Sequence, residues 1–217
     1  MLNSGIFSQI FEEAGINESD LMVFSSIIAV YFAFISIIAI AMYLLQAFGL
    51  YGMAKGSGIS APWRGFIPFA NTFLFGKIAE RYVKKDGKRS AKFGGLLLAF
   101  EILTAVFAIA VFAFVINAFS VIFAHMLTDS EITVAIGYSF VPVIIFFLVF
   151  TVAAIAYAVM YYVALWRIFA AFDYHNATVY LVLSIVFSFL GPIFLFVLRN
   201  KEPVFDQKER FNYLMNK

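Results

Sequence analysis

The chain has 217 residues, of which 64% are hydrophobic and 13% are charged. A soluble core of this chain length cannot bury so large an apolar share, so the composition predicts an integral membrane protein with the bilayer as its solvent. The absence of cysteine excludes disulfides, thiolate metal sites and cysteine nucleophiles, and the only two histidines, His125 and His175, lie too far apart in sequence to suggest a metal site.

Residues 1–20 open the chain with an amphipathic pattern. One face of this segment would carry four apolar residues, Ile6, Phe7, Ile10 and Phe11. We expect it to lie as a helix in the membrane interface. No linker or low-complexity segment divides the chain, so residues 1–217 are interpreted as one integral membrane domain without a cofactor.

Three apolar segments are long enough to cross a bilayer as helices, because each exceeds the roughly 20 residues that a hydrocarbon core requires. They run from 21 to about 54, from about 94 to about 127 and from about 132 to 172. Ser19 and Asp20 precede the first segment and are its expected N-terminal caps. The third contains Pro142, which a membrane helix tolerates. The sequence therefore predicts an all-α fold with three long transmembrane helices.

Two further apolar segments, residues 62–82 and 178–198, are interrupted. Pro68 interrupts the first and the Gly191-Pro192 pair interrupts the second, because proline removes a backbone donor and clashes with the preceding turn. Irregular backbone at membrane depth needs protein or water around it, so the long helices would have to enclose these segments. We expect two re-entrant or interfacial broken helices, with full membrane spans as the alternative.

The positive charges decide between these alternatives. All fifteen Lys and Arg residues lie at position 55 or later, and they flank both interrupted segments. Because such residues prefer the cytoplasmic side, both ends of each interrupted segment and the tail at 200–217 are assigned to the cytoplasm. The N-terminus and the acidic connection at 129–131 are assigned to the outside. If the first interrupted segment crossed fully, the basic loop at 77–92 would lie outside, against this rule.

An internal duplication is a further hypothesis. A shift of 118 residues superimposes four pairs of similar residues: Tyr43 on Tyr161, Phe48 on Trp166, Phe69 on Phe187, and Arg81 on Arg199. Each unit would then be a long helix followed by a broken apolar segment, related by an axis along the membrane normal as a parallel repeat. Chance alignment of two amphiphilic segments is the alternative.

The stretch PWRGFIPFANTFLFGKIA carries a motif of the form W-x-x-x-I-P-x-x-N followed by a small residue and I-A. Its residues here are Trp63, Ile67, Pro68, Asn71, Gly76, Lys77, Ile78 and Ala79. The stretch resembles small polytopic bacterial membrane proteins of unknown function, and the closing GPIFLFVLRNKEP also resembles the way some of them end. The resemblance covers residues 40–85 well. It implies a multi-pass protein of the bacterial plasma membrane and implies no activity.

The chemistry of this stretch suggests roles for three of its residues. Pro62 suits the first turn of a helix, and Trp63 would anchor at the lipid headgroups. Asn71 lies where the backbone groups freed by Pro68 need partners. It therefore either holds the broken helix together or binds a solute.

Glu101 is the only acid well inside an apolar segment. A lone carboxylate at membrane depth is costly, so it should be paired, protonated or facing a wet cavity. One interpretation is an ion pair with Arg167 near the inner end of the third long helix. The others are a proton- or cation-binding carboxylate in a transport route, or an acid that reaches partly to the interface.

Two functions remain open. In a small transporter or channel, the broken helices would converge on a site that comprises Glu101, Asn71, Arg167, Pro68, Gly191 and Pro192. The alternative is a non-catalytic scaffold or accessory subunit that binds lipid or a larger membrane partner. No G-x-S-x-G, H-E-x-x-H or P-loop motif occurs, so we do not expect an enzyme.

The expected partner is the lipid bilayer, and anionic headgroups would contact Trp63, Lys84, Lys85, Lys88 and Arg89. A homo-oligomer would suit either function. The basic loop serves as a topology signal, so no nucleic acid is expected.

Overall fold

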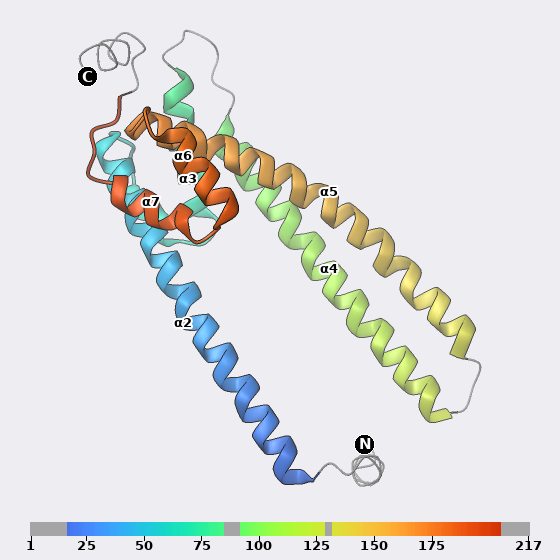
Figure 1. Cartoon of the computed structure of the whole chain (residues 1–217). Helices are drawn as coiled ribbons and strands as arrows, with labels where there is room; N and C mark the ends of the chain where they lie inside the picture. The colour runs from blue at the N-terminus through green and yellow to red at the C-terminus, as the bar shows by residue number, and fades with distance from the viewer. Residues whose placement is uncertain (1–16, 85–91, 129–131, 205–217) are drawn as a thin grey trace. The chain divides into compact units, whose positions relative to one another are not determined.

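The computed structural model describes residues 17–84, 92–128 and 132–204. The elements are the helices α2 (Glu18–Gly56), α3 (Ala70–Lys84), α4 (Phe93–Thr128), α5 (Ile132–Phe172), α6 (Ala177–Val186) and α7 (Leu190–Leu198), with a short 3-10 helix η1 (Pro62–Phe66) before α3 (Figure 1). No strand occurs in these ranges, which confirms the all-α prediction. The interfacial helix expected before residue 17 and the tail after residue 204 lie outside the described residues.

Three of these helices are long and apolar enough to cross a membrane: Met22–Gly56, Phe93–Ala124 and Phe140–Phe172. The helices that contain them, α2, α4 and α5, coincide with the three predicted segments to within a few residues, and α5 continues through Pro142. The protein is therefore a multi-pass membrane protein with three long transmembrane helices.

The first long helix, α2, begins at Glu18, which precedes both predicted caps, Ser19 and Asp20. Asn17 precedes it, and the Asn17 backbone N–H donates to Asp20 Oδ2 at 3.2 Å. Asp20 therefore acts from inside the first turn by reaching back to the capping residue. The prediction that Ser19 or Asp20 is the cap itself was wrong.

The chain divides into two compact units, residues 1–44 and 45–217, which are described separately. The described part of the first unit is α2 as far as Leu44. Its large apolar side chains from Met22 to Ile40 are all exposed, on every side of the helix. A helix that is apolar all round is suited to lipid.

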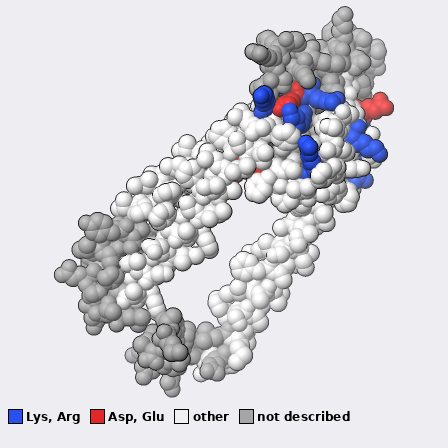
Figure 2. Space-filling view, turned by 180° about the vertical axis from the view of Figure 1, so that it is seen from behind, with Lys and Arg blue, Asp and Glu red and all other residues white. Residues whose placement is uncertain are grey.

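The core of the second unit lies where α3, α6 and α7 pack around the ends of the long helices. Its largest fully buried side chains include Leu50, Met53, Phe75, Ile78, Leu97 and Phe169. We call this region the head, which comprises the described residues within 45–101 and 157–204. Beyond it, α4 carries no charged residue after Glu101 and α5 carries none before Arg167. Figure 2 shows the charged side chains of the second unit gathered over the head.

The first interrupted segment leaves α2 and returns to the same end of the head. η1 runs back along α2, the helix breaks at residues 67–69, and α3 returns. Near the end of α3, Arg81 donates from Nη1 to the Ser57 carbonyl and from Nη2 to the Gly58 carbonyl, the latter at 2.9 Å. The two ends of the segment are thereby tied together, so it forms a hairpin and not a span, with Pro68 in the break as predicted.

The second interrupted segment is also a hairpin. α6 and α7 are separated by a break at residues 187–189, and Lys201 after α7 pairs with Asp173 before α6. The break was predicted at Gly191-Pro192, which was wrong by a few residues. Gly191 and Pro192 lie in the first turn of α7. Proline is tolerated there because the N–H that it lacks would have no partner within the helix.

The two hairpins share an element order, as an internal repeat would, but not the register of the predicted residue pairs. In each, a long helix is followed by a short helix, a three-residue break and a second helix. The breaks at 67–69 and 187–189 are 120 residues apart, two more than the predicted shift of 118. With this register Arg81 corresponds to Lys201, and both are the basic residues that close their hairpins.

Close backbone contacts hold the first hairpin in place. A Cβ added to Gly76 of α3 would lie 2.4 Å from the Cα of Gly94 in α4, so the two helices cross at paired glycines. Beside this crossing, Glu80 Oε1 accepts the Gly94 backbone N–H at 2.8 Å, and Glu80 Oε2 pairs with Lys77 at 2.9 Å. The Glu80 carboxylate thus caps the N-terminus of α4, where the helix dipole favours a negative charge.

Candidate functional site

Three helices of the head bring polar side chains together around Glu101. Thr72 comes from α3, Glu101 from α4 and Tyr157 from α5. The Thr72 hydroxyl lies near both the Glu101 carboxyl and the Tyr157 hydroxyl, and Tyr157 lies close enough to Glu101 to be affected by its charge. Glu101 Oε2 is buried and has no hydrogen-bond partner within the described part of the chain. We call these three residues the carboxyl cluster.

The break before α3 places its first turn inside the head. Asn71 and Thr72 follow the break directly, and both are buried. The Asn71 backbone N–H donates to the Ile67 carbonyl at 2.9 Å, and its side-chain oxygen accepts a hydrogen bond from Gln46 at 3.4 Å. The Asn71 side chain therefore links α3 to α2. The sequence had suggested instead that it would bond to the backbone groups freed by Pro68.

Aromatic rings surround the carboxyl cluster on the α5 side. Tyr161, one turn after Tyr157, stacks on Phe75 of α3 with ring centroids 4.9 Å apart and an interplanar angle of 9°. Its ring centroid is 6.2 Å from that of Tyr157. Tyr157 of the cluster is thus the first of a row of three packed rings that links α5 to α3.

Arg167 does not form the predicted ion pair with Glu101. Its guanidinium lies over the Phe93 ring, 4.5 Å from the centroid, in a cation-π contact. Tyr157 is the α5 residue that lies close to Glu101. Arg167 follows Tyr157 by ten residues along α5, which is about 15 Å of helix. It therefore lies beside Phe93 at the start of α4 and not beside Glu101.

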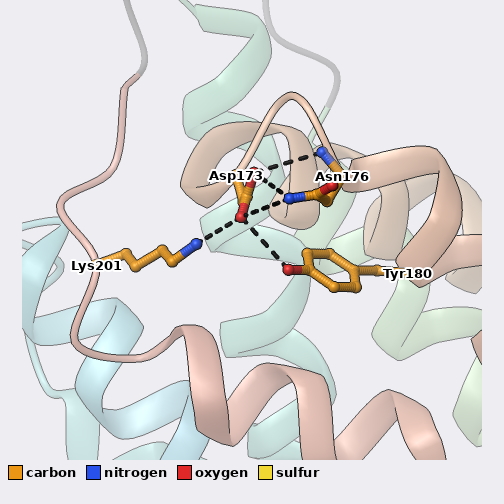
Figure 3. Close-up of polar contacts among 4 residues, drawn as sticks. All are labelled: Asp173, Asn176, Tyr180 and Lys201. Carbon is orange, nitrogen blue, oxygen red and sulfur yellow. Dashed lines mark hydrogen bonds and ion pairs between the residues drawn. The ribbon is translucent and has the colours of Figure 1, made fainter. Parts of the chain in front are cut away.

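A second polar cluster closes the α6–α7 hairpin (Figure 3). The Asp173 carboxylate, in the turn between α5 and α6, accepts hydrogen bonds from the Asn176 backbone and side chain at 3.3–3.4 Å and from the Tyr180 hydroxyl at 3.4 Å. Lys201, reaching across from the chain after α7, completes the set as an ion pair. Because four groups from three segments meet on one carboxylate, this cluster fixes where the hairpin begins and ends.

The electrostatics of Asp173 follow from these contacts. Burial works to raise the pKa of its carboxyl, but the hydrogen bond and charge of Lys201 and the hydrogen bonds of Asn176 outweigh it. The pKa of Asp173 therefore lies below its usual value. Sequence reasoning missed this residue, although an acid three positions before an asparagine at the end of a long helix is a recognisable turn signal.

The other predicted site residues lie in different surroundings. A Cβ added to Gly191 would meet Ser184 and Leu165 at ordinary contact distance, and Pro192 follows Gly191 in α7. Trp63 is 56% exposed, as an interfacial anchor requires. The remaining headgroup candidates, Lys85, Lys88 and Arg89 and the side chain of Lys84, lie outside the described residues.

Within the ranges that the structure describes, no group of three or more His, Asp or Glu residues could hold a metal ion. Comparison of the chain with protein-family models, with curated proteins and with solved structures found no match. The carboxyl cluster must therefore be interpreted from its own chemistry.

Proposed function

We propose that the protein is a small transporter or channel-like protein of the bacterial plasma membrane, without catalytic activity, in which Glu101 binds a proton or a small monovalent cation. The observation that carries the proposal is the buried Glu101 Oε2 atom without a partner among the described residues. An acid in a membrane helix marks an ion or proton pathway more often than it stabilises a fold, because burying it is costly.

The length of α4 is consistent with a position of this acid towards one boundary of the hydrocarbon. Residues 102–124 contain no charged residue and span about 35 Å as a helix, which suffices for a core of about 30 Å. Glu101 then lies where the head meets the membrane. A proton or cation entering from the head side would reach its carboxyl before it reached the apolar part of the helices.

The side on which the head lies follows from the charges. Basic residues of the head and its loops prefer the cytoplasm, so the proposed topology has the N-terminus outside and the head and C-terminus inside. Under this topology the carboxyl cluster is the inner end of the proposed route.

Flux measurements on the purified protein in liposomes test the proposal. With a pH-sensitive dye inside the vesicles, we expect Glu101→Gln to abolish proton flux and Thr72→Val to reduce it. Thr104→Val is the matched control, because Thr104 lies three residues further along α4 and its hydroxyl bonds to the Phe100 carbonyl of the same helix. Flux in folded Glu101→Gln protein equal to that of the wild type would refute the role of the carboxyl. A second series with sodium or potassium gradients separates proton from cation transport.

A scaffold or accessory subunit is the second candidate. It is favoured by the outer faces of α4 and α5, where large apolar side chains such as Ile109, Phe112, Leu148 and Val152 are exposed and polar ones are scarce. A hydrophilic solute would need more polar lining than these helices offer. Wild-type vesicles without flux of any of these ions would favour this function over transport.

A further inference from the structure

A groove runs along α4, next to the start of α3. It has a volume of about 690 Å³, within the range of about 300–1,000 Å³ typical of small-molecule sites. Its walls include Phe69 and Phe73 on one side and Ile102, Val106 and Ile109 on the other. Along α4 it extends from Leu98 to Ile109, which is about 16 Å of helix. The groove is therefore long, narrow and almost entirely apolar.

Among the residues that the structure describes, Arg64 is the only charged one that lines the groove. It belongs to η1, where the adjacent Gly65 packs against the Ala47 carbonyl and Leu74 in the head. Its side chain is exposed, and no hydrogen bond or ion pair joins its guanidinium to another described residue. The head therefore holds a guanidinium that is available to an anion, next to the apolar groove along the uncharged part of α4.

Phe69 gives independent support for a ligand in this groove. Its φ angle is +64°, in the left-handed region that a bulky residue rarely adopts, and the residue is 47% exposed. Strained backbone of this kind is typical of ligand clamps, where the surrounding structure maintains it. Here it directs the chain so that Phe69 lines the groove instead of the core.

We propose that this groove is a specific site for an anionic phospholipid. Its phosphate would bind the Arg64 guanidinium, which offers two parallel donors to a pair of phosphate oxygens, and one acyl chain would lie along Ile102, Val106 and Ile109. Any lipid tail fits an apolar wall, so the selectivity comes from Arg64. A phospholipid without a compensating amine keeps its net negative charge beside this cation, whereas a zwitterionic one does not. The proposal is independent of Glu101 and of transport.

Photo-cross-linking of the full chain in phosphatidylcholine vesicles tests this site. The probe is a phosphatidylglycerol with a diazirine in one acyl chain, present as a minor component, and cross-linked peptides are mapped by mass spectrometry. We expect labelling to concentrate on the α4 residues that line the groove. Unlabelled phosphatidylglycerol should compete with the probe, and added phosphatidylcholine should compete far less. In Arg64→Gln, about tenfold more phosphatidylglycerol should be needed for half competition, which corresponds to a loss of about 1.4 kcal/mol.

Two pairs of variants separate the groove from general effects. Lys55→Gln removes a cation that is exposed but does not line the groove, and it should leave competition unchanged. Ala105→Phe fills the groove and should abolish its labelling, whereas Ala108→Phe adds the same bulk to an exposed position outside it and should not. The site would be ruled out if phosphatidylcholine competed as well as phosphatidylglycerol. It would also be ruled out if Lys55→Gln matched Arg64→Gln, or if Ala105→Phe kept the labelling.

Discussion

The crossing of α3 and α4 provides the sharpest test of how the head is assembled. Replacing Gly76 by alanine would place a methyl group 2.4 Å from the Gly94 Cα and 2.8 Å from its nitrogen. Both are backbone atoms, which cannot turn aside as a side chain would. Since ordinary contact begins at 3.4 Å, the helices would have to separate by about 1 Å.

This separation has two costs and one gain. Overpacking at a close contact destabilises by about 1–3 kcal/mol. The bond from Gly94 to the Glu80 carboxylate, now 2.8 Å long, would be stretched, and a hydrogen bond to a charged group contributes about 1.5–3 kcal/mol. Alanine gains about 1 kcal/mol over glycine in helix propensity. We therefore expect Gly76→Ala to lower the free energy of unfolding by about 1.5–5 kcal/mol.

Gly95→Ala is the control, because a Cβ at Gly95 meets no atom within 4 Å. It should leave stability unchanged or raise it by up to about 1 kcal/mol. Unfolding can be followed by titrating denaturing detergent into mixed micelles and recording tryptophan fluorescence, since Trp166 packs against Tyr82 of α3. If Gly76→Ala proved as stable as Gly95→Ala, the paired-glycine crossing would be incorrect.

Two further predictions concern the hairpin closure and the topology. Because the pKa of Asp173 is lowered in the folded protein, its stabilisation is complete above the unfolded value of about 3.9 and is lost as the pH falls through the lower folded value. Asp173→Asn should therefore cost about 1–2 kcal/mol at pH 7 in the same unfolding titration and almost nothing at strongly acidic pH, and an equal cost at both would contradict the ion pair. The natural chain has no cysteine, so single cysteines at Gly58, Gly87, Ser130 and Phe205 can be labelled in intact cells. Only Ser130→Cys should react with an impermeant reagent from outside, and external labelling of Gly87→Cys would reverse the topology.

The two hairpins are closed by different chemistry at corresponding places. Arg81 binds backbone carbonyls in the first, whereas Lys201 binds a carboxylate in the second. The bonds at the second closure therefore depend on the charge of an acid, whereas the bonds from Arg81 to the Ser57 and Gly58 carbonyls do not. If the two hairpins are an internal repeat, their geometry has been kept while the contacts that close them have diverged.

The sequence by itself determined the membrane class, the three long helices and the two hairpins. Hydropathy over some twenty residues and the position of Lys and Arg are properties of composition along the chain, so they need no knowledge of contacts. The position of the Pro68 break could be predicted for the same reason, since proline acts on its own backbone.

Only the tertiary structure decided which side chains meet. The sequence paired Glu101 with Arg167 by charge, but the offset between α4 and α5 brings Thr72 and Tyr157 to that carboxyl and leaves Arg167 on Phe93. The roles of Glu80, Asp173 and Gly76 were equally hidden, because each depends on a partner from another segment of the chain. Helix lengths follow from local preferences. Contacts between helices depend instead on how far each helix is shifted along its axis and rotated about it relative to its neighbour. A small change in this placement exchanges one contacting side chain for another.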